Sequence, residues 1–273
     1  MTDTKSAVKR LNIERQIEMR KKRIIFLDID GTLVGRDRVH PRNKEAVSKA
    51  RKMGYYIILN TGRARSYTSS ALWDNIEIDG IISGVGSRIE IHGKAIYEKY
   101  IDPEFVYDSV KRFHNTSNGF LIVGVKKSFV LNPTSVYEGW NFVRINEPES
   151  FLLDENNSDI QKIEMFGESI SKDDKDYFAK HLAVVDFGSV IECARRDCTK
   201  ATAMDRVLDY LGIKKENSIA IGDSSNDIEM LKNAGIAIAM GNAEESVKNI
   251  ADFVTTDCDD GGVGYAIEKM LMR

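Results

Sequence analysis

The chain has 273 residues and a formal net charge of −3, with 42% hydrophobic and 30% charged residues. This composition is that of a globular protein of one or two domains, and the charge offers no attraction to nucleic acid or to an anionic membrane. No apolar run reaches the ~20 residues that cross a bilayer, and residues 1–16 lack the apolar core of a secretion signal. Without such a signal, Cys193, Cys198 and Cys258 are expected to be reduced thiols of a cytoplasmic protein.

A basic arm is predicted at residues 1–23. Eight Lys or Arg residues and three acidic residues lie there, so the arm carries +5 and residues 24–273 carry −8. Apolar residues at roughly helical spacing favour a solvated, partly helical arm. An anchor for a partner subunit or for an anionic surface stays open as the alternative.

Alternating strands and helices follow the arm. Residues 24–29, IIFLDI, are almost continuously apolar, as in a strand that is buried on both faces. Pro41 and Gly54 suit the first turn and the end of a helix over 41–54. The next elements are predicted at 55–60 (strand), 61–74 (a turn leading into a helix) and 78–83 (strand). This βαβαβ order predicts a parallel sheet with helices on both faces.

The middle of the chain breaks this alternation, because strand-like segments occur there in hairpin-like groups. Strands are predicted within 120–131, 160–166 and 183–193, and helices at 104–114 and 171–182. The alternation then returns, with helices predicted at 199–213, 225–235 and 262–272, strands at 218–223 and 252–256, and a strand and turn at 236–243. The middle segments predict an α+β module that interrupts the α/β part.

The predicted fold class is therefore α/β, with a Rossmann-like, doubly wound parallel sheet as the core. Residues 24–84 and 193–273 are assigned to this core domain. Residues 85–192 are assigned to an inserted α+β domain, with boundaries uncertain by several residues.

Two aspartates stand two positions apart where the first predicted strand ends. Side chains at i and i+2 of a strand share a side, so Asp28 and Asp30 are expected to point together. They lie at the carboxyl end of a central strand, where open parallel sheets bind ligands. Two such carboxylates repel each other and need a cation beside them. Mg²⁺ fits, because it takes one or two carboxylates and shares its remaining positions with water and phosphate.

A second acidic stretch, GDSSND, follows the strand predicted at 218–223. Asp223 and Asp227 are four positions apart and can converge on the same ion. A helix cap is the competing interpretation, since Asp, Ser and Asn all suit that position. Capping does not explain acidic clusters at two separate strand ends, so a metal site is favoured.

Two further stretches suit a phosphate. In NTGR, Thr61 and the backbone N–H groups beside Gly62 can bind phosphate oxygens, and Arg63 can add positive charge. A plain strand-to-helix turn is the competing interpretation of this tetrapeptide. Lys200 stands at the start of a helix, where a cation opposes the helix dipole, and this favours a role such as neutralising a phosphate.

In their order and spacing, these stretches resemble the four motifs of the haloacid dehalogenase superfamily. The similar segments are DIDGTL, NTGR, CTKATAMDRVLDYLGI and GDSSNDIEML. The tail GIAIAMGNAEESVKNIADFVTTDCDDGGVGYAIEKM resembles that of the Cof-like phosphatase branch, which carries a large α+β cap between its second and third motifs. The resemblance covers about residues 24–273 and implies that residues 85–192 are such a cap.

The resemblance also implies a role for each site residue. Asp28 is expected to be the nucleophile that forms an aspartyl-phosphate, and Asp30 the acid for the leaving group and then the base for water. The phosphate is expected to be held by Thr61, Gly62, Lys200 and Asn226. Mg²⁺ is expected to be held by Asp28, the Asp30 backbone carbonyl and Asp223, with Asp227 in support.

These roles predict a Mg²⁺-dependent phosphatase that acts on a small phosphorylated metabolite, with sugar phosphates as the leading class. No nucleic acid or membrane partner is expected. A phosphosugar mutase with the same nucleophile and a non-enzymatic, phosphate-binding regulatory module stay open as alternatives. The sequence departs from many relatives at Val85-Gly86-Ser87, where they carry Asn-Gly-Ala, and at Asp197 and Ala201, where they carry Gly. These departures leave the substrate less certain than the chemistry.

Overall fold

The structure is a computed structural model that describes residues 23–36, 38–132, 142–168 and 170–271. The basic arm predicted at residues 1–23 lies outside the described residues, except for Arg23. Within the described ranges, no helix is both long and apolar enough to cross a membrane.

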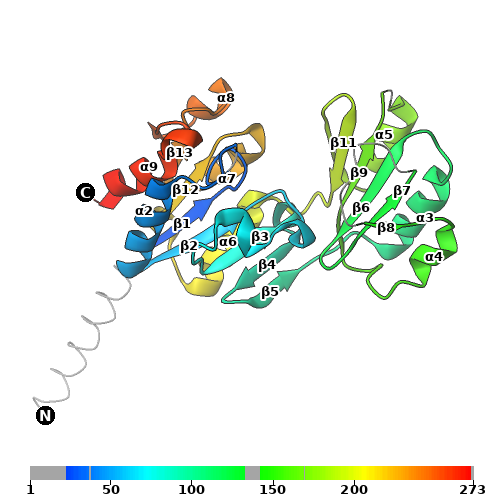
Figure 1. Cartoon of the computed structure of the whole chain (residues 1–273), viewed down its shortest axis with the longest axis horizontal. Coiled ribbons are helices and arrows are strands. Elements are labelled where there is room, and N and C mark those ends of the chain that lie inside the picture. Colours follow the sequence, from blue (N-terminus) through cyan, green and yellow to red (C-terminus); the bar gives the residue numbers. More distant parts are fainter. Residues whose placement is uncertain (1–22, 37, 133–141, 169, 272–273) are drawn as a thin grey trace, which may run out of the picture. The chain divides into compact units, whose positions relative to one another are not determined.

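The larger sheet has eight strands in the order β14-β13-β12-β1-β2-β3-β4-β5 (Figure 1). The bounds are β1 Arg23–Leu27, β2 Tyr55–Asn60, β3 Gly80–Ser83, β4 Arg88–Ile91, β5 Lys94–Glu98, β12 Ser218–Gly222, β13 Ile236–Ala239 and β14 Phe253–Val254. β1 pairs in parallel with β2 and β12, and the parallel pairing continues through β13 to β14. The predicted parallel α/β sheet is confirmed.

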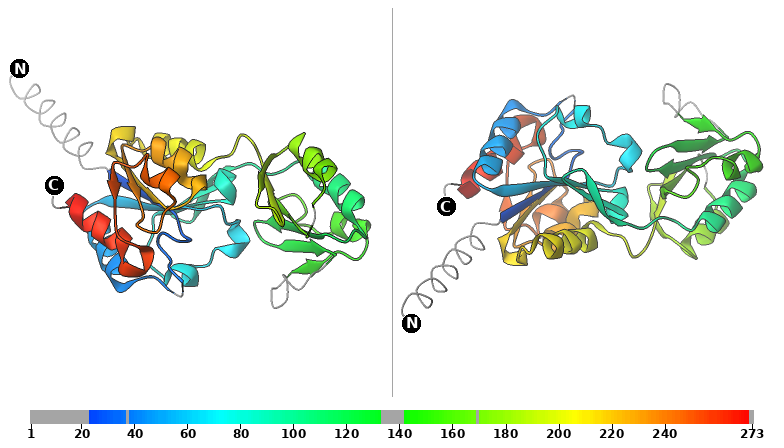
Figure 2. Two further views of the ribbon diagram at one scale, coloured as in Figure 1. Left: turned by 90° about the horizontal axis from the view of Figure 1, so that it is seen from above. Right: turned by 90° about the horizontal axis from the view of Figure 1, so that it is seen from below.

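Helices cover both faces of the parallel part of this sheet (Figure 2). Their bounds are α2 Pro41–Lys52, α6 Lys200–Leu211, α7 Ile228–Lys232, α8 Glu245–Lys248 and α9 Gly262–Leu271. α2 and α9 pack together on one face, and α6 and α7 lie on the other. The four side chains from Ile24 to Leu27 are fully buried, as expected of a strand with both faces covered.

The start of α2 follows from its local sequence. Pro41 occupies the first helical turn, where its missing N–H costs no hydrogen bond. The His40 side chain caps the helix, because its Nδ1 accepts a hydrogen bond from Arg42 N at 3.2 Å. The proline signal read from the sequence therefore marks the true beginning of this helix.

Three predicted elements differ in extent or kind from those observed. The strand expected over 24–29 ends at Leu27, and the helix expected over 225–235 is a 3₁₀ turn at Ser225–Asp227 followed by α7. The segment 61–74 forms two 3₁₀ helices, Arg65–Tyr67 and Ser70–Trp73, in place of one α-helix. Hydroxyl side chains explain this, since they compete for backbone partners. The Thr68 hydroxyl, for example, donates to Arg65 O at 2.8 Å.

Sequence reasoning missed the antiparallel hairpin formed by β4 and β5. Its turn is His92-Gly93, with positive φ angles of 50° and 74°. Two central turn residues with positive φ fit the tight hairpin turns that match the strand twist. The available signal was the alternating apolar pattern of RIEI before the histidine and glycine and the short apolar run AIY after them.

The smaller sheet has six strands in the order β10-β11-β9-β6-β7-β8. The bounds are β6 Gly119–Gly124, β7 Ser128–Leu131, β8 Val143–Arg144, β9 Ile160–Phe166, β10 Ala183–Asp186 and β11 Val190–Ala194. Its helices are α3 Pro103–Phe113, α4 Pro148–Leu152 and α5 Lys172–Ala179. All of its pairings are antiparallel except β7 with β8. Its fully buried aromatics Phe120, Phe129, Phe151 and Phe178 belong to one apolar core.

The chain divides into two compact units. Of the residues that the structure describes, the first unit contains those within Met1–Asn60, Ser70–Ile81 and Ala203–Arg273, and the second those within Thr61–Ser69 and Ile82–Thr202. The parallel strands from β14 to β2 belong to the first unit, and the whole six-stranded sheet belongs to the second.

Asn43 provides a test of the packing in the first unit. Its fully buried amide donates to Leu33 O at 3.5 Å and accepts from Gly264 N at 2.8 Å, which joins α2 to α9. We expect Asn43→Ala to lower the free energy of unfolding by about 1–3 kcal/mol, because it leaves a buried N–H without its acceptor. Urea denaturation measures this, with the exposed Asn249→Ala as the matched control. Equal loss in both variants would contradict the packing role of Asn43.

Candidate active site

Asp28 lies directly after β1 and is 5% exposed. Its backbone is fixed on both sides: Asp28 N donates to Ile221 O at 3.1 Å, and Leu33 N donates to Asp28 O at 3.3 Å. The first bond ties the residue to β12, and the second closes the turn that follows β1. The position of this carboxylate is therefore set by the centre of the parallel sheet.

Asp28, Asp223 and Asp227 converge. One carboxylate oxygen from each of the three lies within 4.8 Å of the other two. Asp28 and Asp223 come directly after two neighbouring parallel strands, β1 and β12, whose carboxyl ends meet at the same edge of the sheet. The sequence-based expectation that these three carboxylates gather is met by this geometry.

Asp227 is fully buried and also shapes the loop that carries Asp223. Its Oδ2 accepts hydrogen bonds from Asp223 N at 3.0 Å and from Ser224 N at 3.2 Å. Asp227 and Ser224 form a reciprocal capping box. The two interpretations of GDSSND are therefore compatible, because one carboxylate caps the loop and also belongs to the acidic cluster.

Gly31 allows Asp223 to approach the turn after β1. Its φ is +75°, and a Cβ built on it would lie 2.4 Å from Asp223 Oδ2. Thr32 Oγ1 donates to Asp223 Oδ1 at 2.9 Å, which orients this carboxylate from the same turn. The DGT stretch thus contributes a backbone conformation, a space and a hydrogen bond to the cluster.

Asn242 supports the same turn and was missed by sequence reasoning. Its Nδ2 donates to Gly31 O at 2.8 Å, and its Oδ1 accepts from Cys258 N at 2.9 Å. The available signal was the Gly-Asn pair at the turn of the segment predicted at 236–243. Burial, the charge of Asp259 and, more weakly, that of Asp223 raise the pKa of the Cys258 thiol, so it is neutral near pH 7.

Asp30 differs in solvent exposure from the three carboxylates that converge. Its side chain is exposed, and its backbone forms an isolated bridge with Val34. The sequence argument that Asp28 and Asp30 share a side assumed a strand through Ile29, but β1 ends at Leu27. Strand alternation therefore does not fix the direction of Asp30.

The predicted phosphate-binding residues Thr61, Gly62 and Lys200 belong to the second unit. Thr61 is 1% exposed, its N donates to Ile82 O at 3.0 Å, and its Oγ1 accepts from Arg63 N at 3.1 Å. A Cβ added to Gly62 would meet no atom within 4 Å, so the space beside its backbone is open. An open backbone beside a fixed hydroxyl suits an anion.

Lys200 is 2% exposed, although it is the first residue of α6. Thr199 and Thr202 cap this helix start, since Thr202 N donates to Thr199 Oγ1 at 3.1 Å and Thr199 N donates to Thr202 Oγ1 at 3.0 Å. Burying a lysine at the positive end of a helix costs free energy. The observed burial excludes the interpretation of Lys200 as an ordinary, solvated surface lysine. Asn226 is exposed and accepts a hydrogen bond from Ser224 Oγ at 3.0 Å.

The acidic cluster fits a hard divalent cation. Its three side chains offer only oxygen ligands, and Asp28 and Asp227 are buried where an uncompensated charge is unfavourable. An all-oxygen donor set suits a hard cation such as Mg²⁺ better than it suits zinc, which favours Cys or His ligands.

Comparison with known proteins places the chain in a family. Residues 25–267 match the family of haloacid dehalogenase-like hydrolases. The 5-amino-6-(5-phospho-D-ribitylamino)uracil phosphatase YcsE of Bacillus subtilis strain 168 is 29% identical over 261 residues, which cover 92% of this chain and 96% of that protein.

Similarity to solved structures supports the same family assignment. A protein of Geobacillus kaustophilus HTA426 superimposes with a TM-score of 0.82 at 26% identity, over 92% of this chain and all of that one. The subclass IIB sugar phosphatase BT4131 superimposes with a TM-score of 0.77 at 25% identity, over the same shares. The chain therefore belongs to the haloacid dehalogenase-like hydrolase family and is an enzyme, which confirms the resemblance seen in the motifs.

Gly31 allows a test of the cluster's geometry. Gly31→Ala combines a left-handed φ with a collision against Asp223, whereas Gly188→Ala has a φ of +86° but open space around its Cβ. We expect Gly188→Ala to destabilise the protein by about 1 kcal/mol and Gly31→Ala to destabilise it more and to weaken Mg²⁺ binding. Urea denaturation and calorimetric Mg²⁺ titration measure both effects. If the two variants bind Mg²⁺ alike, the close approach of Gly31 to Asp223 is not needed for the site.

Proposed function

We propose that this enzyme is a Mg²⁺-dependent phosphatase that hydrolyses a phosphoric monoester of a small metabolite through an aspartyl-phosphate on Asp28. The observation that carries the proposal is the convergence of Asp28, Asp223 and Asp227 at the carboxyl ends of β1 and β12. Membership of a hydrolase family supports it, as does the fact that similar proteins are named phosphatases.

The metal site consists of Asp28, the Asp30 backbone carbonyl and Asp223, with Asp227 behind them. When bound there, Mg²⁺ neutralises charge, so that an anionic nucleophile can approach an anionic phosphate. Asp227 holds the loop of Asp223 in place through its two backbone hydrogen bonds. The acidic cluster thus binds the cation and presents Asp28 to the substrate.

The reaction has two steps. In the first, an Asp28 carboxylate oxygen bonds to phosphorus while the bond from phosphorus to the ester oxygen breaks, and Asp30 protonates that leaving oxygen. In the second, water attacks the aspartyl-phosphate, gives a proton to Asp30, and releases inorganic phosphate and free Asp28. Thr61, the N–H groups beside Gly62, Lys200 and Asn226 hold the phosphoryl oxygens.

The inserted domain at residues 85–192 selects the substrate. Sugar phosphates are the leading substrate class. One similar protein is named a sugar phosphatase, and another is named for a substrate with a phosphorylated ribityl chain. The cytoplasmic location expected from the sequence and the lack of a nucleic acid or membrane partner stay predictions.

Chelation tests the metal. We expect hydrolysis of p-nitrophenyl phosphate to disappear in excess EDTA and to return when Mg²⁺ is added in excess, because Asp28 needs the cation beside it. Asp223→Ala should raise the Mg²⁺ concentration needed for half-maximal rate, whereas the exposed Asp108→Asn on α3 should behave as the wild type. Full activity in excess EDTA would remove the metal from the mechanism, and an isomerised phosphosugar in place of free phosphate would indicate a mutase.

Asp30→Asn tests the acid–base role. The amide keeps the shape but transfers no proton, so we expect a loss of roughly 10²–10⁴-fold on an alkyl phosphate. An aryl phosphate should lose less in the first step, because an aryl oxide leaves readily without a proton. Steady-state kinetics on both substrates and mass spectrometry of trapped aspartyl-phosphate measure this. Equal slowing on both substrates with no trapped intermediate would assign Asp30 another role.

A further inference from the structure

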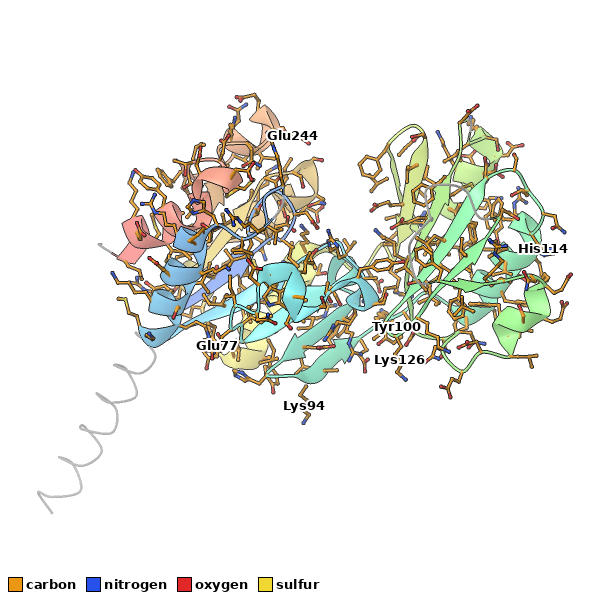
Figure 3. All side chains as sticks on the ribbon, viewed as in Figure 1. Glu77, Lys94, Tyr100, His114, Lys126 and Glu244 are labelled. Atoms are coloured by element: carbon orange, nitrogen blue, oxygen red, sulfur yellow. The ribbon has the colours of Figure 1, made fainter. Side chains whose placement is uncertain are left out.

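The helices α3 and α4 of the second unit pack against each other, and a groove remains between them (Figure 1). It has a volume of about 290 Å³ and is lined by Glu104 and Tyr107 of α3 and by Phe151 and Leu152 of α4. These residues of α3 lie in its first half, away from His114, which follows its last turn (Figure 3). Phe151 belongs to the apolar core of this unit and Tyr107 packs against that core, so the floor of the groove is apolar.

Two consecutive leucines are exposed where α4 ends. Leu152 is 48% exposed and Leu153 is 87% exposed. Asn157 fixes this end of the helix, because its Nδ2 donates to Leu152 O at 2.9 Å and to Phe151 O at 3.3 Å. Single exposed apolar residues are common, but adjacent leucines beside an apolar groove are typical of a surface that another segment covers.

Both walls of the groove are acidic. They are formed from residues 102–110 and 147–157, which contain seven acidic residues and no Lys or Arg. Lys111 and Lys127 lie beside these walls, and each forms an ion pair with one of the seven, at 2.8 Å and 3.0 Å. The other five are Asp102, Glu104, Glu147, Glu149 and Glu155. All five are exposed, and none of them has an ion pair with a residue that the structure describes.

The basic arm at residues 1–23 has the opposite charge. It carries +5, and its sequence places apolar residues at roughly helical spacing, for instance Ile13 and Ile17, which are four positions apart. An amphipathic segment of this kind binds an apolar groove through its apolar residues and the rim of the groove through its charges. The arm therefore matches the groove both in charge and in apolar character.

Two copies of the chain can exchange their arms. The 22 residues that precede Arg23 span up to about 70–80 Å when extended, which is enough to reach a second molecule. A reciprocal exchange has two-fold symmetry and fills both grooves, so no arm and no groove is left over. An interface of standard size takes about 20–30 residues from each partner, and one arm with one groove from each copy supplies that number.

We propose that the groove between α3 and α4 binds the basic arm of a second copy of this chain, and that reciprocal exchange of the arms forms a dimer. Apolar side chains of the arm cover Leu152 and Leu153, and its Lys and Arg residues pair with the acidic walls. The inference is independent of the proposed phosphatase function, because every candidate catalytic residue lies after position 27 and outside α3 and α4.

Sedimentation of the full chain tests the dimer. Interfaces of standard size have dissociation constants in the micromolar range or below, so we expect a dimer at a chain concentration of about 100 μM in low salt. Raising the NaCl concentration from roughly 0.05 M to roughly 0.5 M should raise the dissociation constant by about tenfold or more, because salt screens the charge attraction. A chain that is monomeric at this concentration in low salt would overturn the proposal.

Carbodiimide cross-linking of the full chain locates the contact, because it joins a lysine amine to a neighbouring carboxylate without a spacer. In a mixture of isotope-labelled and unlabelled chains, we expect cross-links from Lys9 or Lys21 to Glu104 or Glu149 that join one labelled and one unlabelled peptide. Mass spectrometry detects these mixed pairs. Arm cross-links that form only within one chain, or that never reach α3 or α4, would contradict the exchange of arms.

Charge reversal assigns the attraction to the groove. The double variant Glu104→Lys with Glu149→Lys should raise the dissociation constant of the dimer by about tenfold or more, whereas Glu168→Lys, at an exposed position elsewhere in the second unit, should leave it unchanged. Adding Lys9→Glu and Lys21→Glu to the double variant should restore part of the lost affinity, a gain that misfolding cannot produce. A double variant that dimerises as well as the wild type, or a quadruple variant that dimerises no better than the double one, would show that the groove does not bind the arm.

Discussion

Three carboxylates held close together impose the main constraint on this molecule. Unit charges 4.8 Å apart repel each other by about 3 kcal/mol at an effective dielectric constant of about 20, and the burial of Asp28 and Asp227 adds a desolvation cost. Such an arrangement persists only if the surrounding structure holds each group in place. A cation bound between these carboxylates would turn the repulsion into attraction, which is the physical argument for proposing a metal site here.

The first unit supplies that support through backbone geometry more than through side chains. β1 and β12 are adjacent and parallel, so the residues that follow them meet at one edge of the sheet. Gly31 leaves the space that Asp223 occupies, and Gly222 does the same for Asp227, whose Cγ lies 2.5 Å from a Cβ built there. Asn242 then fastens the turn after β1 from a third strand end. Each support comes from a different part of the chain.

The second unit is organised differently from the first. One sheet there packs an apolar core on one face and carries charged side chains on the other. The alternation of strand side chains lets β9 place Ile163 in the core and Lys162 and Glu164 on the other face. Gln161, which is fully buried, joins this strand to the segment after Thr61. Gln161 therefore ties the segment after Thr61 to the strand that carries Lys162 and Glu164.

The parallel sheet, most helix positions and the acidic motifs followed from the sequence alone, because hydrophobic period and turn residues are local signals. The hairpin at Arg88–Glu98 was missed. The strand predicted over 24–29 proved shorter, because the end of β1 depends on the turn that Gly31 allows. The sequence by itself pointed to the side chains that we propose to carry the chemistry, for instance Asp28 and Asp223. Only the tertiary structure decided that Asp227 both caps a loop and joins the cluster, and that Lys162 lies between two glutamates, because these contacts join residues from separate strands and turns.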